Sequence, residues 1–205
     1  MNHGALEDSF ARQDIESLIK RFQIKRVVET GSYYGWSTKI FASLVEVVDS
    51  IEIEKQYFNR AKNNLQSTHN VNLHLGDSVE VMEQILKDGE SNVLFFLDAH
   101  WKDHWPILNE LNVIKNKNIK PVICIHDFFV PGGKKLRQPG GGFIIDQTYE
   151  GSKFGYDDHN SVPLDFDYIK ETIKEIYPDG FSYHYNTDID KVDSGLIYIY
   201  PTQND

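Results

Sequence analysis

The sequence IKRVVETGSYYGWST, residues 24–38, runs from a short apolar stretch through two glycines into a helical pattern. The β-branched run at 24–29 predicts a buried strand. At the turn that follows, Gly31 and Gly35 permit positive φ angles and a close approach of a ligand to the backbone. The glycine spacing is neither that of a dinucleotide fingerprint nor that of a phosphate loop. Two interpretations of this segment therefore remain: a turn that binds a ligand, and a tight turn without a ligand.

Apolar and amphipathic segments alternate along the rest of the chain. Apolar runs predict further strands at 47–54, 71–75, 93–97 and 121–125. Helical spacing predicts helices at 14–22, 37–44, 56–65, 79–86, 105–114 and 166–176, with Ser78 as a candidate N-cap. This alternation indicates an α/β fold with a doubly wound, mostly parallel sheet and helices on both faces. Tyr-rich runs at 181–185 and 196–200 predict an antiparallel pair at the sheet edge.

Composition limits the class of protein. A chain of 205 residues suits one domain, 1–205, and 21 basic against 31 acidic residues give a net charge of −10. That charge disfavours nucleic acid and anionic membranes as partners. The single cysteine, Cys124, excludes an internal disulfide and a multi-cysteine metal site. No apolar run reaches the roughly 20 residues that span a bilayer, and residues 1–10 lack signal-peptide features, so we expect a cytoplasmic protein.

Regular spacing stops between residues 128 and 163, where seven of the fourteen glycines lie. An aperiodic stretch of this length is usually a functional lid or a disordered insert. It contains a basic cluster, Lys134, Lys135 and Arg137. We expect this segment to be a lid over the bound substrate, with the basic cluster contacting an anionic group of that substrate. A surface insert with solvated lysines is the alternative.

Polar residues stand at the carboxyl ends of all five predicted parallel strands. They are Glu29, Glu52, Asp77, Asp98 and the pair His126-Asp127. Ligands of open α/β sheets bind beyond these strand ends, so we expect the side chains to share one edge. At this edge Glu52 can accept both hydroxyls of a ribose. Asp77 can accept the amino group of an adenine or, as an alternative, cap the following helix.

The order of these motifs resembles that of the class I S-adenosylmethionine-dependent methyltransferases. They are Glu-Thr-Gly-x-x-x-Gly-x-Ser-Thr at 29–38, Ile-Glu-Ile-Glu at 51–54, Gly-Asp-Ser at 76–78, Leu-Asp-Ala-His at 97–100 and His-Asp at 126–127. The resemblance covers residues 24–127. The last two motifs are most similar to the small-molecule O-methyltransferase branch that includes the macrocin- and cephalosporin-tailoring enzymes. The resemblance implies a Rossmann-like, seven-stranded sheet with an antiparallel last strand.

The resemblance also implies where the cofactor S-adenosylmethionine binds. Residues 29–35 would hold its methionine part, Glu52 its ribose, and Asp77 with Ser78 its adenine. The full set of expected cofactor-binding residues is Glu29, Thr30, Gly31, Ser32, Tyr33, Gly35, Ser37, Thr38, Glu52, Asp77, Ser78 and Asp98.

In metal-dependent relatives, a carboxylate after the fourth strand and an acidic or amide pair after the fifth hold a divalent cation. Asp98 and Asp127 match these positions, whereas His126 departs from the usual oxygen donor, and the three together are the expected metal ligands. Magnesium prefers oxygen ligands, whereas imidazole better suits zinc or manganese, so the choice among Mg, Mn and Zn stays open. A cation would lower the pKa of a substrate hydroxyl. Without a cation, His100 or His126 could act as the general base, or His126 could only fix Asp127. We therefore expect Asp98, His100, His126 and Asp127 to be catalytic.

These residues predict methyl transfer from S-adenosylmethionine to a small-molecule acceptor, at oxygen. One alternative is a catalytically silent nucleotide-binding module, and another is a metal-dependent hydrolase or hydroxylase on the same fold. The four catalytic candidates argue against the silent module, because pure binding would not need them. We expect a small-molecule partner and neither nucleic acid nor membrane, and the sequence is compatible with an oligomer.

Overall fold

The computed structural model describes residues 6, 9–100, 105–130, 148–149, 152–153, 156–157, 162–186 and 195–203. Its main sheet contains β1 (Arg26–Thr30), β2 (Val47–Glu52), β3 (Val71–Leu75), β4 (Val93–Leu97), β5 (Val122–His126), β10 (Phe181–Tyr185) and β11 (Leu196–Pro201). The strand order is β10-β11-β5-β4-β1-β2-β3. The first five strands pair in parallel, and β11 pairs antiparallel with both β5 and β10. The predicted seven-stranded sheet with an antiparallel last strand is confirmed.

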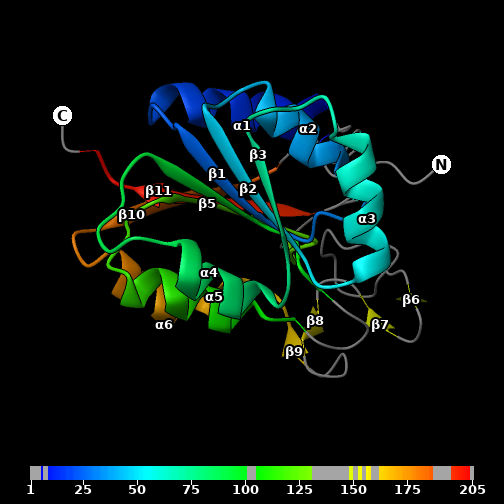
Figure 1. Ribbon diagram of the computed structural model, residues 1–205. Helices are drawn as coiled ribbons and strands as arrows, with labels where there is room; N and C mark the ends of the chain where they lie inside the picture. Colours follow the sequence, from blue (N-terminus) through cyan, green and yellow to red (C-terminus); the bar gives the residue numbers. More distant parts are fainter. Residues whose placement is uncertain are drawn as a thin grey trace.

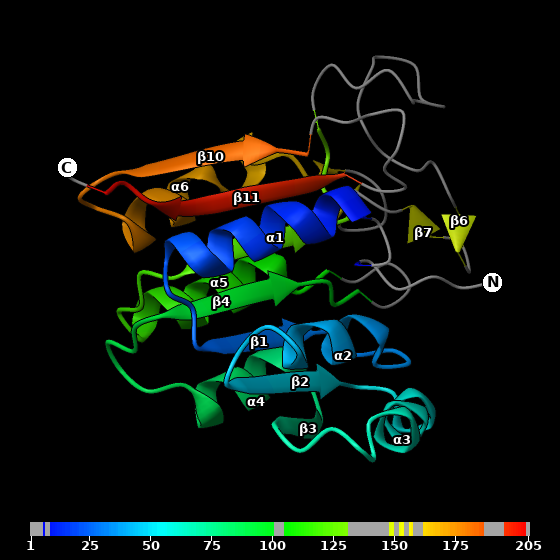
Figure 2. The ribbon, with the colours of Figure 1, turned by 90° about the horizontal axis from the view of Figure 1, so that it is seen from above.

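Helices cover both faces of the sheet (Figure 1). They are α1 (Ser9–Arg21), α2 (Trp36–Ala42), α3 (Lys55–Asn64), α4 (Ser78–Ile85), α5 (Ile107–Asn116) and α6 (Phe166–Ile176). Figures 1 and 2 show α1 and α2 on one face, with α3 near the β3 end of the sheet, and α4, α5 and α6 on the other face. In the parts that the structure describes, no helix has the length and apolar character needed to cross a membrane.

The central strand β4 explains why the sheet has two cores. All five of its residues are buried. Phe95 and Leu97 pack in the core under α4, α5 and α6, whereas Leu94 and Phe96 pack in the core under α1 and α2. A strand buried on both faces needs a continuous apolar run, which is what residues 93–97 supply.

The start of α4 confirms one of the two predicted caps. Asp77, not Ser78, is its N-cap, and Asp77 Oδ1 accepts hydrogen bonds from the N–H groups of Val79 (2.9 Å) and Glu80 (3.3 Å). Ser78 is the first helical residue. Both residue types are good caps, but the carboxylate also favours the positive end of the helix dipole.

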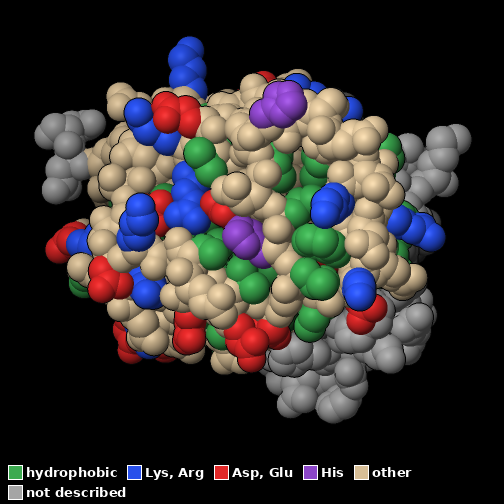
Figure 3. All heavy atoms as spheres, viewed as in Figure 1, with side chains coloured by type: hydrophobic (Ala, Val, Ile, Leu, Met, Phe, Trp, Pro, Cys, Tyr) green, Lys and Arg blue, Asp and Glu red, His purple; other side chains and the backbone are tan. Residues whose placement is uncertain are grey.

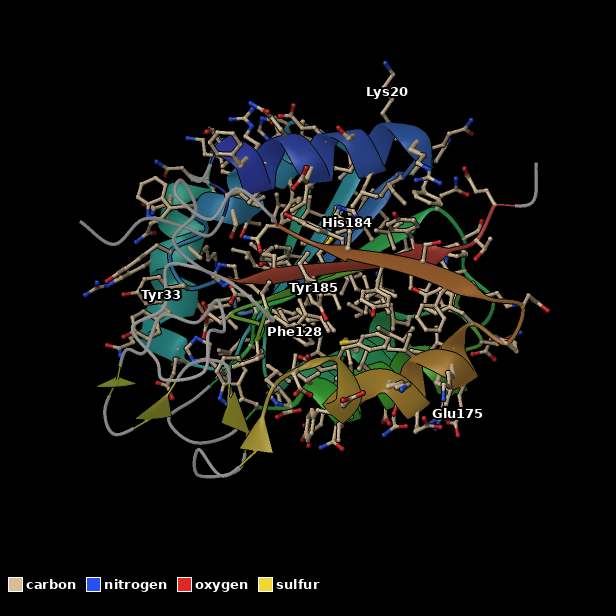
Figure 4. All side chains as sticks on the ribbon, turned by 180° about the vertical axis from the view of Figure 1, so that it is seen from behind. Lys20, Tyr33, Phe128, Glu175, His184 and Tyr185 are labelled. Carbon is tan, nitrogen blue, oxygen red and sulfur yellow. The ribbon has the colours of Figure 1, made fainter. Side chains whose placement is uncertain are left out.

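The segment after β5 is more ordered at its start than its composition predicts. Phe128 is fully buried in the main core, and its N–H donates to the carbonyl of Gly195 (2.9 Å). Phe128 also lies near Tyr185, with ring centroids 6.4 Å apart (Figure 4). Four two-residue strands follow as two antiparallel pairs: β6 (Thr148–Tyr149) with β7 (Ser152–Lys153), and β8 (Tyr156–Asp157) with β9 (Val162–Pro163). Lys134, Lys135 and Arg137 lie outside the described residues, so the lid stays a prediction.

Candidate functional site

The glycine turn after β1 lies directly against the end of β4. Gly31 has φ +85°, and a Cβ atom added there would lie 2.6 Å from the carbonyl oxygen of Asp98. The N–H of Asp98 in turn donates to the carbonyl of Thr30 (3.2 Å). Gly35 has φ +77°, and an added Cβ would lie 2.8 Å from a methyl carbon of Leu65. Gly31 is therefore favoured by its φ angle and by its contact with the backbone of Asp98, whereas Gly35 is favoured mainly by its φ angle, because the Leu65 methyl group can move.

Glu29 lies beneath this turn with no exposed surface. Its Oε2 accepts hydrogen bonds from the hydroxyls of Thr38 and Ser50, each at 2.5 Å. Its Oε1 has no hydrogen-bond partner among the residues that the structure describes. Burial raises the pKa of Glu29 to about 7, although the neighbouring hydroxyls favour the ionised form. The unpaired oxygen is available to a ligand that carries a proton donor.

Glu52 ends β2 and ties the glycine turn to the sheet. Its Oε2 accepts from the N–H of Tyr33 and its Oε1 from the N–H of Glu54, both at 2.8 Å. Burial raises the pKa of this carboxyl above its usual range, and the two N–H donors act against that change. Each oxygen retains a lone pair, so a ribose can still be bound there. Figure 4 shows Tyr33 beside α3.

Two of the residues expected to bind the cofactor, Ser32 and Thr38, have side chains that are buried and hydrogen-bonded within the protein. Ser32 Oγ lies 2.5 Å from Ser50 Oγ, and both side chains are buried. Thr38 is fully buried and donates to Glu29. Both side chains therefore stabilise the turn after β1, and their contact with the cofactor stays a prediction.

The structure brings Asp98, His126 and Asp127 together. One ligand atom from each lies within 4.8 Å of the others. His126 Nδ1 is 2.9 Å from Asp98 Oδ1 and 3.5 Å from Asp127 Oδ1. Burial disfavours charge on His126, but the carboxylates of Asp127 and Asp98 outweigh burial and hold its pKa well above its usual value. Carboxylate oxygens and an imidazole nitrogen in this arrangement suit a divalent cation.

His100 stands at the side of this cluster. Its ring stacks on Trp105 with centroids 4.7 Å apart, and its Nε2 lies 3.9 Å from Asp127 Oδ2. Asp127 has φ +51°, a left-handed conformation that is uncommon outside glycine. All four residues expected to be catalytic thus share one edge, and their roles remain predictions.

Sequence reasoning missed one residue, Glu110 on α5. It has no exposed surface, and neither carboxyl oxygen has a hydrogen-bond partner in the described part of the chain. Burial raises its pKa to about 7, and the hydroxyls of Ser78 and Thr30 lie close enough to oppose that shift. The sequence does carry a signal, because Glu110 stands at helical spacing between Ile107, Leu111 and Ile114, on the apolar face.

A second polar cluster lies away from this edge and is fully paired. Arg26 joins Asp49 (2.8 Å) and Glu90 (2.7 Å), and His74 Nε2 lies 2.7 Å from Asp49. Figure 3 shows basic and acidic side chains interspersed on this face of the molecule. Because its members satisfy one another, this cluster is a structural network rather than a ligand site.

Comparisons with known proteins identify the family and support the fold. The family model described as O-methyltransferase matches residues 7–120. No curated protein matches the sequence. A Staphylococcus aureus structure assigned as a caffeoyl-CoA O-methyltransferase has a TM-score of 0.57 at 15% identity, over 94% of this chain and 83% of that one.

Two further solved structures are similar to this chain. A Streptococcus mutans protein assigned as a methyltransferase, in complex with SAH, has a TM-score of 0.56 at 15% identity, over 98% of this chain and 99% of that one. An rRNA methylase from Streptococcus thermophilus has a TM-score of 0.55 at 12% identity, over 99% of both chains. At such low identity these structures show the fold alone.

The family match spans more than half of the 205 residues. It confirms S-adenosylmethionine as the cofactor and the protein as an enzyme, while the narrower similarity to macrocin- and cephalosporin-tailoring enzymes stays a prediction. The chain belongs to the S-adenosylmethionine-dependent O-methyltransferase family.

Proposed function

We propose that this enzyme transfers the methyl group of S-adenosylmethionine to an oxygen of a small molecule, at the edge where β1, β4 and β5 end. The main support for this proposal is the contact between the glycine turn after β1, where the cofactor would bind, and the cluster of Asp98, His126 and Asp127. Gly31, on the cofactor turn, lies against Asp98, and Asp98 lies within 4.8 Å of His126 and Asp127. The cofactor and the acceptor would therefore meet beside Asp98.

The cofactor would lie across the ends of β1, β2 and β3. The backbone of the turn at Gly31 and the unpaired oxygen of Glu29 would receive its methionine part. Glu52 would accept the ribose hydroxyls, and Asp77 with Ser78 would face the adenine. Asp77 uses Oδ1 to cap α4, so Oδ2 is the oxygen that we assign to the ligand.

Transfer is a single displacement. The acceptor oxygen attacks the methyl carbon, the carbon–sulfur bond breaks and S-adenosylhomocysteine leaves, while the proton of the acceptor hydroxyl passes to the imidazole of His100 as general base. Alignment of the oxygen, carbon and sulfur provides much of the rate enhancement in such a reaction. We assign Asp98 and Asp127 to orientation of the acceptor hydroxyl, with His100 Nε2 as a further hydrogen-bonding partner.

Asp98, His126 and Asp127 fit a divalent cation that accepts both oxygen and nitrogen ligands, so manganese or zinc suits them better than magnesium. When bound, such a cation would lower the pKa of the acceptor hydroxyl.

Charge favours a small molecule over RNA as the acceptor. The protein carries a net charge of −10, and carboxylates of Glu52, Asp77, Asp98 and Asp127 border the proposed site. An RNA backbone would be repelled by this edge, because RNA-binding sites neutralise phosphates with basic residues. Residues 1–205 form one functional unit in this proposal, and the cytoplasmic location stays a prediction.

Methyl transfer can be tested directly. The protein is incubated with S-adenosylmethionine and either a panel of phenols, catechols and sugars or total ribosomal RNA, and S-adenosylhomocysteine and methylated products are measured. We expect product from a hydroxylated small molecule, loss of activity in Asp98→Asn, and no change in the exposed control Asp179→Asn, whose side chain is 83% exposed. Methylation of RNA alone would contradict the small-molecule proposal.

A further inference from the structure

The turn after β1, residues 31–35, holds one residue in a conformation that its side chain disfavours. Gly31, Tyr33 and Gly35 all have left-handed φ angles, of +85°, +48° and +77°. Glycine adopts such angles at no steric cost, whereas Tyr33 carries a Cβ atom and is strained there. A strained residue persists only where the surrounding structure fixes it, so the contacts that Tyr33 and its neighbours make outside the turn are decisive.

Two side chains of α3 contact Tyr33 and Tyr34. The ring of Tyr33 lies against the ring of Tyr57, with centroids 4.6 Å apart. Figure 4 shows the Tyr33 side chain beside α3. The backbone carbonyl of Tyr34 accepts a hydrogen bond from the side-chain amide of Asn64 at 2.9 Å. One contact therefore fixes a ring of the turn, and the other fixes its backbone.

Arg60 and Ala61 of α3 add to these contacts. Nη1 of Arg60 donates to the hydroxyl oxygen of Tyr34 at 2.5 Å, and the guanidinium lies 5.1 Å from the centroid of the same ring. Gly35 also lies close to the helix, because an added Cβ atom would be 3.4 Å from the Cβ of Ala61. Each residue in the second half of the turn therefore has a contact with α3.

We propose that Asn64 and Tyr57 are positioning residues for the cofactor, which hold the turn after β1 in the conformation that binds S-adenosylmethionine. They act through Tyr34 and Tyr33 and not on the reacting atoms. This inference rests on the proposed function, which places the methionine part of the cofactor at this turn. The N–H of Tyr33 also bonds Glu52, the residue assigned to the ribose. A shift of Tyr33 would therefore disturb both parts of the cofactor site.

This role predicts a loss of cofactor affinity without a loss of maximal turnover. A turn released from α3 would sample other conformations, and only the fraction in the binding conformation accepts the cofactor. The apparent dissociation constant rises by the inverse of that fraction. Saturating S-adenosylmethionine selects the same bound conformation, so kcat should stay near the wild-type value while KM for S-adenosylmethionine rises.

Two adjacent asparagines of α3 provide a matched pair of variants. Asn64→Ala removes the donor to the Tyr34 carbonyl, and Asn63→Ala removes an amide from the neighbouring exposed position. Alanine favours a helix more than asparagine does, so neither variant should unfold α3. We expect Asn64→Ala to raise KM for S-adenosylmethionine and Kd for S-adenosylhomocysteine by about 3- to 10-fold, roughly the effect of one hydrogen bond. Asn63→Ala should match the wild type.

The ring contact is tested at Tyr57. Tyr57→Ala should weaken S-adenosylhomocysteine binding by a similar factor, and Tyr57→Phe, which keeps a ring against Tyr33, should restore most of it. Amide hydrogen exchange reports on the turn directly. The Tyr33 N–H, which bonds Glu52, should exchange faster in Asn64→Ala and Tyr57→Ala than in Asn63→Ala. A residue that only stabilises the fold would lower Tm and leave both KM and this exchange rate unchanged.

The outcomes separate this inference from the proposed function. A wild-type protein that does not bind S-adenosylhomocysteine by calorimetry, or a Glu52→Ala variant that binds it as the wild type does, contradicts the proposed cofactor position and this inference with it. Weaker binding in Glu52→Ala, together with wild-type affinity in Asn64→Ala and Tyr57→Ala, contradicts the role of α3 alone. Equal losses for Asn64→Ala and Asn63→Ala, or a fall in kcat with KM unchanged, also overturn it.

Discussion

Tyr33 and Glu52 are joined by a hydrogen bond from the backbone N–H of Tyr33 to Oε2 of Glu52, at 2.8 Å. Tyr33 has φ +48°, in the left-handed region that bulky residues rarely adopt. The bond compensates part of that strain, so one carboxylate both shapes the turn after β1 and faces the proposed ribose position. Strain of this kind concentrates at functional sites.

Removal of that carboxylate should weaken cofactor binding. We expect Glu52→Ala to reduce the affinity for S-adenosylhomocysteine by about 1–3 kcal/mol, because the ribose hydroxyls and the N–H of Tyr33 lose their acceptor. Titration calorimetry measures the change. Glu46→Ala is the control, since the Glu46 side chain is 70% exposed. Equal affinity of Glu52→Ala and the wild type would disprove the ribose assignment.

The two buried glutamates predict that stability falls as the pH rises. The pKa values of Glu29 and Glu110 are raised to about 7 in the folded protein, from an ordinary value of 4.5. Between these values the folded state holds more protons than the unfolded state, so the free energy of unfolding decreases with increasing pH. We expect each group to contribute roughly 1–3 kcal/mol between pH 5 and pH 8.

Urea unfolding of the cofactor-free protein at pH 5 and pH 8 checks this expectation. Glu29→Gln and Glu110→Gln should each flatten the dependence on pH, because neither amide titrates. The exposed variant Glu83→Gln should keep the wild-type slope. A wild-type protein of equal stability at both pH values would show that these carboxyls are ionised in the folded state.

Chelation tests the cation at Asp98, His126 and Asp127. If the enzyme uses a cation, exhaustive treatment with a chelator should abolish turnover, and manganese or zinc should restore it better than magnesium. Asp127→Asn should require a higher concentration of metal for the same activity. Full turnover after chelation would exclude a requirement for a cation and would favour the mechanism in which a histidine acts as the general base.

Substitution of Gly31 should damage both stability and activity. Gly31→Ala places a methyl group 2.6 Å from the Asp98 carbonyl oxygen at a φ of +85°. The matched control is Gly89→Ala, which has φ +66° but open space around the added carbon. We expect the control to lose about 1 kcal/mol from backbone strain, and Gly31→Ala to lose more. Thermal unfolding and turnover measure the difference, and equal losses would mean that the contact with Asp98 is unimportant.

The parallel part of the fold was predictable because burial on both faces leaves a strong pattern. The apolar run at 93–97 defines β4 to the residue, and the ends of parallel strands place Asp98 beside His126 and Asp127. Two adjacent capping residues, Asp77 and Ser78, could not be ranked by pattern alone. The short strands β6 to β9 have two residues each, too few for an alternation of side chains to be visible.

Glu110 shows a different limit of sequence reasoning. Helical periodicity assigns residues to faces, but it does not tell which polar residue on an apolar face is a local irregularity and which is a functional group. The carboxyl lies close to Thr30 and Ser78, which are distant from it in the sequence, so its surroundings become visible only in the folded chain.

The close approach of Gly31 to Asp98 has a consequence for engineering the enzyme. No additional carbon fits between Gly31 and Asp98. We therefore expect the turn that binds S-adenosylmethionine and the first residue on the acceptor side to move as one rigid piece. Changes that widen the range of acceptors by reshaping this contact would also disturb donor binding. Redesign of acceptor choice should therefore begin at Trp105, which precedes α5, stacks on His100 and leaves that rigid piece intact.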